Sequence, residues 1–207
     1  MTKNQKTKDV THLLEEKEIL YKELNHRIKN NLQMMLSLVK LQISQSPHEE
    51  TKQALTITKN RINSFAYLYE SLYQQSNSTI ETEEYFRHII HAIQLMTLKK
   101  VKIIYDITHN LTTDKLLYVT LILNELVTNA FKYAFEKEGE LHVALHKKKQ
   151  LVTMIVSDNG EGFNPTKISN GLGLTIVETL VKNQLYGTID ITGDKGTTIT
   201  LSWEEHE

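Results

Sequence analysis

The chain has 207 residues, with 24 Lys or Arg against 25 Asp or Glu, and 40% of its residues are hydrophobic. This composition excludes wholesale disorder, and the near-neutral charge argues against a partner with a nucleic-acid backbone. The absence of cysteine excludes disulfides, thiolate metal sites and a cysteine nucleophile. No apolar run reaches the roughly 18–20 residues that span a bilayer, and no signal peptide is recognisable. We therefore expect a cytoplasmic chain whose sensing part, if any, lies on another chain or was removed.

The chain changes character along its length. All eight glycines lie between Gly139 and Gly196, and the first 138 residues contain a single proline. Because glycine gathers where the backbone turns tightly or approaches a ligand, long helices are predicted first and a turn-rich α/β region later. Residues 1–9 are predicted to form a polar tail.

Residues 10–75 are predicted to form a helical hairpin. The first helix carries apolar residues three, four or seven positions apart: Val10, Leu13, Leu20, Leu24, Ile28, Leu32, Met35, Val39 and Ile43. The second repeats the pattern to about Tyr73: Leu55, Thr58, Ile62, Phe65, Tyr69 and Leu72. Between them, Ser46, Pro47 and Glu49 match a capping box with Ser46 as N-cap. A lone hairpin has little core, so the stripes are expected to form a four-helix bundle with a second copy; the alternative is packing on the chain's own C-terminal domain.

Residues 80–207 are predicted to form a second domain after a polar segment at 74–79. Its expected elements are a helix at 83–97, a strand at 101–107, a very apolar helix at 114–135, strands at 140–146 and 151–157, a helix at 173–185, and strands at 187–192 and 197–203. Helices with a mixed sheet of about five strands indicate a two-layer α/β sandwich, so the whole chain is predicted to be α+β.

His26 is the first candidate for chemistry. The apolar stripe lies on a different side of its helix, so the imidazole is predicted to face solvent, with Asn30 one turn away on the same face. A neutral imidazole can act as a nucleophile. An ordinary surface histidine is the simpler interpretation, but the polar segment from Asn25 to Asn31 interrupts an apolar-striped helix with three asparagines. Such a local inconsistency is typical of a functional site.

The helix at 114–135 carries a second candidate set. Glu125, Asn129 and Lys132 stand at i, i+4 and i+7 and should share one face, with Tyr133 beside them. A polar seam in a buried helix is either a structural hydrogen-bond network or the wall of a wet ligand pocket. In the second case the Asn and Glu side chains could hold a hydrated Mg²⁺, and the lysine could meet a phosphate.

Glycine-rich turns supply the remaining candidates. Asp158 ends an apolar strand and is followed by Gly160 and Gly162. The run Gly171-Leu172-Gly173-Leu174 opens a helix, whose free N–H groups could bind phosphate. Gly196 and Thr197 begin the last strand.

Taken in order, these motifs resemble the sensor histidine kinases. His26 with Arg27, Lys29, Asn30 and Asn31 is similar to the H-box of the HWE-related subgroup, the second HisKA-type family. The segment 124–130 resembles the N-box, segments 158–162 and 171–174 resemble two G-boxes, and Gly196-Thr197 resembles the last turn of that fold. Five motifs in the family's order are more specific than any one alone.

The resemblance implies a dimerising phosphoacceptor hairpin followed by a GHKL (Bergerat) domain that binds ATP and Mg²⁺. His26 would accept the γ-phosphoryl group and pass it to an aspartate of a response regulator. Asp158 would accept a hydrogen bond from the adenine amino group, backed by Thr197 through a water. Asn129 would hold Mg²⁺, Glu125 would polarise a group beside the metal, and Lys132 would touch the phosphates. The resemblance also places these residues around the nucleotide: Tyr133, Gly160, Gly162, Gly171, Leu172, Gly173 and Leu174.

Two departures from the commonest histidine kinases stand out. Arg27 occupies the place of the acid that usually follows the histidine, so the base that serves His26 would be Glu23 or a residue of the ATP domain. No separate phenylalanine-rich box is visible, and Asn30 stands where the common family orients a water for dephosphorylation. Two alternatives remain: an ATPase or Ser/Thr kinase on the same fold, and a histidine phosphotransfer module without kinase activity.

Overall fold

The computed structural model describes residues 3–74, 81–162, 172–193 and 195–205. Within its helices, the side chains of residues 3–22, 25, 65, 68–74 and 172 are not described. The chain divides into two compact units, with the division between Gln74 and Gln75.

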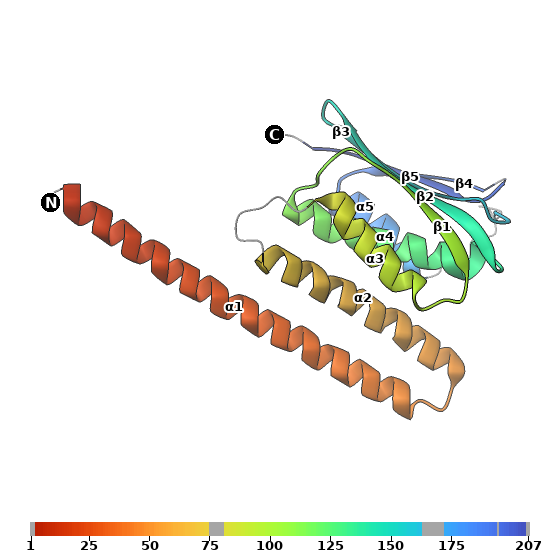
Figure 1. Cartoon of the computed structure of the whole chain (residues 1–207), viewed down its shortest axis with the longest axis horizontal. Helices are drawn as coiled ribbons and strands as arrows, with labels where there is room; N and C mark the ends of the chain where they lie inside the picture. Colours follow the sequence, from red (N-terminus) through yellow and green to blue (C-terminus); the bar gives the residue numbers. More distant parts are fainter. Residues whose placement is uncertain (1–2, 75–80, 163–171, 194, 206–207) are drawn as a thin grey trace. The chain divides into compact units, whose positions relative to one another are not determined.

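The first unit is a helical hairpin. Helix α1 (Lys3–Gln45) is followed by α2 (Glu49–Gln74), which returns alongside it (Figure 1). Residues 3–9 of the expected polar tail are part of α1. The apolar stripe of α1 is half-buried at Ile28, Leu32, Val39 and Ile43. The predicted stripe residues Val10, Leu13, Leu20, Phe65, Tyr69 and Leu72 lie outside the described side chains.

The predicted capping box at Ser46 is wrong. Helix α2 begins at Glu49, and its first turn is closed by the N–H of Lys52, which donates to the carbonyl of His48 at 3.1 Å. The N–H of Ser46 still donates to Gln42 at 3.0 Å, and its hydroxyl donates to the His48 carbonyl at 3.4 Å. Ser46 therefore closes the end of α1 and is not placed to cap α2.

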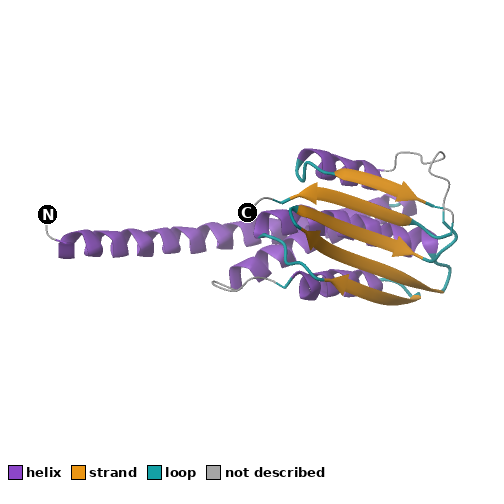
Figure 2. Cartoon of the chain, turned by 90° about the horizontal axis from the view of Figure 1, so that it is seen from above, coloured by secondary structure: helices purple, strands orange, loops and turns teal. Residues whose placement is uncertain are grey.

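The second unit is built on one five-stranded sheet. Its strands are β1 (Lys100–Ile107), β2 (Glu138–Lys148), β3 (Leu151–Asp158), β4 (Thr188–Thr192) and β5 (Thr198–Glu204). They lie in the order β1-β2-β3-β5-β4 (Figure 2). The pair β1–β2 is parallel and the others are antiparallel, so the sheet is mixed as predicted.

Three helices cover one face of this sheet: α3 (Thr82–Gln94), α4 (Thr113–Asn129) and α5 (Leu172–Asn183) (Figures 1 and 2). Along β3, buried side chains alternate with more exposed ones, as expected of a sheet with helices on one side. The core between the layers includes Phe86, Ile90, Leu123, Met154 and Trp203. The α+β class and the two-layer sandwich are therefore confirmed.

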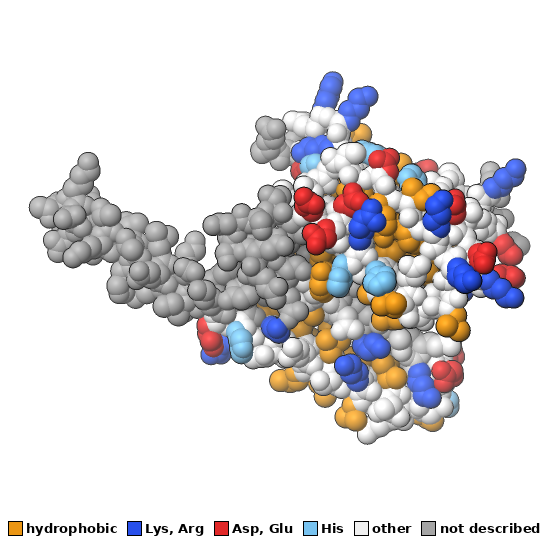
Figure 3. Space-filling view, in the orientation of Figure 1, with side chains coloured by type: hydrophobic (Ala, Val, Ile, Leu, Met, Phe, Trp, Pro, Cys, Tyr) orange, Lys and Arg blue, Asp and Glu red, His pale blue; other side chains and the backbone are white. Residues whose placement is uncertain are grey.

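The surface of the described residues is mixed in character. Figure 3 shows basic and acidic side chains interspersed on one face of the molecule. Large apolar side chains stay more than half exposed on α1, at Leu24, Met34, Met35, Leu38 and Leu41.

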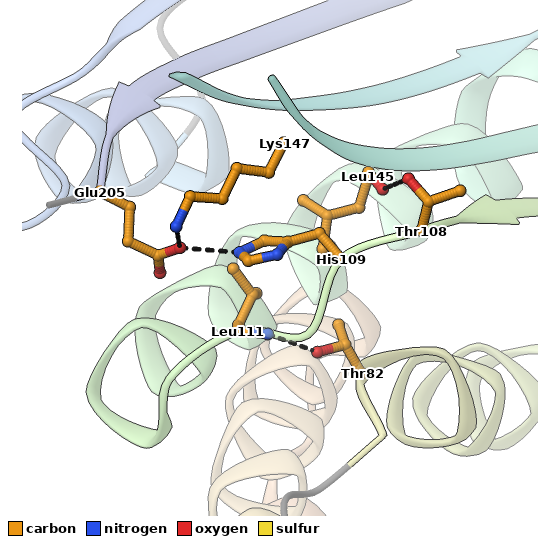
Figure 4. Close-up of polar contacts among 7 residues, drawn as sticks. All are labelled: Thr82, Thr108, His109, Leu111, Leu145, Lys147 and Glu205. Atoms are coloured by element: carbon orange, nitrogen blue, oxygen red, sulfur yellow. Dashed lines mark hydrogen bonds and ion pairs between the residues drawn. The ribbon is translucent and has the colours of Figure 1, made fainter. Parts of the chain in front are cut away.

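A buried carboxylate ties the end of β5 to the rest of its unit (Figure 4). Oε2 of Glu205 lies 2.7 Å from Nε2 of His109 and 2.9 Å from Nζ of Lys147. Burial raises the pKa of Glu205, but the hydrogen bonds from Lys147 and His109 outweigh burial and leave the pKa below its ordinary value. Nearby, the Thr82 hydroxyl accepts from the N–H of Leu111 at 2.9 Å, which fixes the start of α3.

Candidate functional site

His26 lies on an exposed part of α1, as its position off the apolar stripe predicts. The side-chain amide of Asn30, one turn later, lies 3.2 Å from Nδ1 of the imidazole. Glu23, one of the two sources suggested for a base, instead accepts a hydrogen bond from Nε of Arg27 at 2.8 Å. Arg27 thus engages the carboxylate, and Asn30 is the neighbour that contacts the imidazole.

The contact with Asn30 gives the two imidazole nitrogens different surroundings. The amide nitrogen of Asn30 can only donate, so Nδ1 accepts this hydrogen bond and the neutral imidazole carries its proton on Nε2. Among the described residues, no hydrogen bond is made to Nε2. The amide therefore occupies Nδ1, and Nε2 is the nitrogen that could meet a phosphoryl donor once a base has taken its proton.

The polar seam of the second unit begins deep inside α4. Asn124 and Glu125 are 1% and 4% exposed, and both have polar or electrostatic partners. Asn129 is half-buried and is the last residue of α4. Gly173 of α5 faces both side chains, since a Cβ built there would lie 2.7 Å from Oε2 of Glu125 and 3.8 Å from Nδ2 of Asn129. The structure thus brings Glu125, Asn129 and Gly173 together, and the absence of a Cβ at Gly173 leaves room for the buried Glu125 carboxylate.

The single helix predicted at 114–135 is wrong in its last turn. The α-helix ends at Asn129 and continues as a π-helical turn, η1 (Ala130–Ala134). A π turn changes the rotation per residue, so Lys132 leaves the ideal α-helical face that it was expected to share with Glu125. Both Lys132 and Tyr133 are exposed, and the lysine ammonium lies 4.9 Å from the centre of the Tyr133 ring.

Asp158 stands at the end of β3, 9% exposed. Its Oδ1 accepts from the backbone N–H of Gly160 at 3.0 Å and from that of Thr197 at 3.1 Å. The backbone N–H of Asp158 in turn donates to the Thr197 carbonyl at 2.9 Å. Thr197 therefore contacts Asp158 directly through its backbone, whereas the resemblance implies a bridging water. Among the described residues, no donor reaches Oδ2.

The first glycine turn packs tightly on the end of the seam. A Cβ at Gly160 would collide with the carbonyl of Ala134, the last residue of η1. Gly162 has a φ of 71°, a left-handed conformation that favours glycine. The turn after Asp158 and the π turn after Asn129 are therefore in direct contact.

The second glycine motif is only partly described. Gly171 lies outside the described residues, and Leu172 begins α5 without a described side chain. Leu174 is half-buried in the first turn of α5.

Two residues near the site were missed by the sequence analysis. Lys99 precedes β1 and donates hydrogen bonds to two carbonyls at the end of η1. Ala134 contacts Gly160. No sequence signal marks either residue, because a lysine before a strand and an alanine after a helix are common everywhere.

The residues present fit a nucleotide with a hydrated cation. Asp158 offers Oδ2 as an acceptor at a buried, fixed carboxylate, which suits an amino group of a base. Glu125 and Asn129 offer the oxygen atoms that Mg²⁺ prefers. Across the parts of the chain that the structure describes, no three His, Asp or Glu side chains gather to hold a metal ion. A cation at Asn129 would therefore need phosphate and water oxygens to complete its coordination.

The fold and the site define a class of two-part proteins in which a hairpin with an exposed histidine precedes a nucleotide-binding α/β sandwich. Residues 23–97 match the family model HisKA_2, described as histidine kinase. Residues 115–207 match the family described as histidine kinase-, DNA gyrase B-, and HSP90-like ATPase. The chain belongs to the histidine kinases of the HisKA_2 type and carries an ATPase domain of the second family, which implies use of ATP.

Named relatives agree with this assignment. The sensor histidine kinase PdtaS of Mycobacterium tuberculosis is 27% identical over 89% of this chain and 39% of its own length. The sensor protein kinase GraS of Staphylococcus aureus is 27% identical over 86% of this chain and 58% of its own length. The chain thus spans less than two thirds of the length of these two relatives.

A solved structure shares the fold. The histidine kinase domain from the Erythrobacter litoralis EL346 blue-light activated histidine kinase has a TM-score of 0.63 at 23% identity, covering 87% of this chain and 91% of that one. Within the described ranges, no helix combines the length and hydropathy needed to cross a bilayer.

Proposed function

We propose that the chain transfers the γ-phosphoryl group of ATP to Nε2 of His26 and passes it on to an aspartate of a response regulator. The proposal rests on two features of one chain. His26 is exposed, with Nδ1 bonded to Asn30, and the second unit has a candidate nucleotide site around Asp158 and Asn129. Phosphoryl transfer depends on positioning and charge neutralisation more than on covalent help, so these two parts suffice in principle. Because ATP is supplied in the cytoplasm, this activity would place the chain there.

In this proposal each described residue of the candidate nucleotide site has one role. Oδ2 of Asp158 accepts from the adenine amino group while Gly160 and Thr197 hold Oδ1. Asn129 supplies an oxygen to Mg²⁺, and Glu125 orients a water or ligand beside it. Lys132 offers its ammonium group to the phosphates. Mg²⁺ supplies neutralisation of the phosphate charge when bound.

Tyr133 and the glycine motif of α5 complete the proposed nucleotide site. Tyr133 is 70% exposed beside Lys132, where a ring can cover a bound nucleotide. Gly173 leaves space in front of Glu125. Gly162, Gly171, Leu172 and Leu174 are proposed to shape the floor and the lid of the site.

Two copies of the hairpin are proposed to form a four-helix bundle. The exposed apolar side chains of α1 are of the kind that a partner helix would cover: Leu24, Met34, Met35, Leu38 and Leu41. Isolated exposed apolar residues are normal, but several on one helix mark an interaction surface. The response regulator and an upstream sensory part are proposed as further partners.

Autophosphorylation with γ-labelled ATP tests the proposal. The wild-type chain should acquire label that survives base and is lost in acid, as expected of phosphohistidine, and His26→Gln should acquire none. Acid-stable label would instead indicate a Ser/Thr kinase. Nucleotide binding without protein label would indicate an ATPase, and no nucleotide binding at all would leave only a phosphotransfer module.

A further inference from the structure

The π-helical turn η1, which continues α4, is held by a residue from outside the helix. The final carbonyls of any helix lack intrahelical partners. Nζ of Lys99 lies 2.6 Å from the carbonyl oxygen of Phe131, within η1, and 2.6 Å from that of Phe135, the residue that follows η1. Lys99 is half-buried and belongs to the connection between α3 and β1, more than 30 positions earlier in the chain. Its ammonium group therefore caps the end of η1 with two charge-assisted hydrogen bonds.

The same turn is also anchored in the core by two aromatic side chains. The rings of Phe131 and Phe135 are 2% and 4% exposed and pack edge to face, with centroids 6.1 Å apart. The backbone of Gly139 lies against the Phe135 ring, where a Cβ would not fit. The buried rings and the Lys99 hydrogen bonds thus both hold the turn, and Lys132 and Tyr133 remain exposed.

The position of η1 affects both ends of the candidate site. Asn129 directly precedes the π turn, so the position of η1 affects the backbone that carries the Asn129 side chain. Ala134 ends the turn and contacts Gly160, whose N–H donates to Asp158. A shift of η1 would therefore displace both the Asn129 side chain and the loop that follows Asp158.

We propose that Lys99 is a positioning residue for nucleotide binding, acting through η1 without touching the nucleotide. π turns are rare, are found mostly at functional sites, and need support from their surroundings. Lys99 provides that support at the two carbonyls where the helical hydrogen bonds end. This inference rests on the proposed function, because it assigns Lys99 to the same ATP site.

The test measures ATP affinity in the full chain carrying Lys99→Met, which keeps most of the apolar stem and removes the donors. Lys99→Arg restores a charged donor that can bond both carbonyls. Lys102→Met is the matched control, because this lysine of β1 is 69% exposed and pairs with Glu140 on the surface. Val152→Ala controls for lost stability, since Val152 is fully buried on β3 but roughly 20 Å along the strand from Asp158. Melting temperatures are recorded for every variant.

We expect Lys99→Met to weaken ATP binding by about tenfold or more, and Lys99→Arg to recover most of this loss. Val152→Ala should lower the melting temperature without changing ATP affinity, and Lys102→Met should change neither. The inference is overturned if Lys99→Met binds ATP as the wild type does. It is also overturned if Val152→Ala loses as much affinity at an equal loss of melting temperature, or if Lys99→Arg is as impaired as Lys99→Met. Failure of the wild-type chain to bind ATP would contradict the proposed function itself.

Discussion

The side-chain amide nitrogen of Asn30 lies 3.2 Å from Nδ1 of His26, one turn along α1. The carboxylate nearest in sequence, that of Glu23, is bound by Arg27. An uncharged amide can hold the imidazole in one tautomer and one orientation, but it cannot remove a proton. The base that takes the proton from His26 must therefore come from another group or from water.

Asn30→Ala should slow autophosphorylation without weakening ATP binding. The lost hydrogen bond is worth about 0.5–1.5 kcal/mol, which corresponds to a roughly two- to tenfold lower rate if the bond is needed in the transition state. The measurement is the initial rate of label transfer to His26 at saturating ATP. Asn31→Ala, which alters an exposed neighbour, is the control. Equal rates for Asn30→Ala and wild type would remove Asn30 from the reaction.

Asp158→Ala should weaken ATP binding by about 1–3 kcal/mol, because it removes a buried acceptor and leaves the N–H groups of Gly160 and Thr197 without their carboxylate. Titration calorimetry with ATP measures the change. Asp190→Ala on β4 is the matched control, since that aspartate is exposed. Unchanged affinity in Asp158→Ala would show that the adenine does not bind at the end of β3.

Gly173→Ala should impair ATP binding in a protein that remains folded. Alanine is favoured over glycine inside a helix by up to about 1 kcal/mol, so helix propensity predicts no loss of stability. The added Cβ, however, would lie 2.7 Å from Oε2 of Glu125, whose side chain is buried and has little room to move. Circular dichroism and ATP titration are measured together, with Thr179→Ala on the exposed side of α5 as control. Wild-type affinity in Gly173→Ala would mean that the space in front of Glu125 is not part of the site.

Glu205→Gln should lower the free energy of unfolding at pH 7 by about 1–3 kcal/mol, because Lys147 and His109 lose their shared carboxylate. The folded-state pKa of Glu205 lies below its ordinary value of 4.5, so the charged carboxylate stabilises the fold above that pH. This stabilisation is lost as the pH falls through the folded-state pKa.

Urea unfolding of wild type and Glu205→Gln at pH 7 and again below pH 4 tests the expectation, with Glu204→Gln on the exposed side of β5 as control. The gap between the two proteins should narrow in acid. A gap that stays the same at both pH values would assign the effect to packing instead of charge.

Local patterns were sufficient for most of the architecture. The spacing of apolar residues predicted the two long helices of the hairpin, and alternation along Val101 to Ile107 predicted β1. These predictions hold because helix and strand periods are properties of neighbouring residues. Local pattern failed at two places. Ser46 was expected to cap α2, but its backbone N–H extends the hydrogen bonding of α1. After Asn129, the α-helical spacing of the residues did not predict the π turn.

The sequence by itself determined the candidate residues for chemistry and their order along the chain: an exposed histidine, an Asn–Glu seam, an aspartate at a strand end and glycine turns. Only the tertiary structure decided how they meet. Thr197 reaches Asp158 because β5 inserts between β3 and β4, Lys99 reaches η1 because β1 starts beside β2, and Glu205 meets His109 from 96 positions away. Such contacts depend on strand order and packing, which join segments that share no local pattern, and sequence spacing along one element does not encode them.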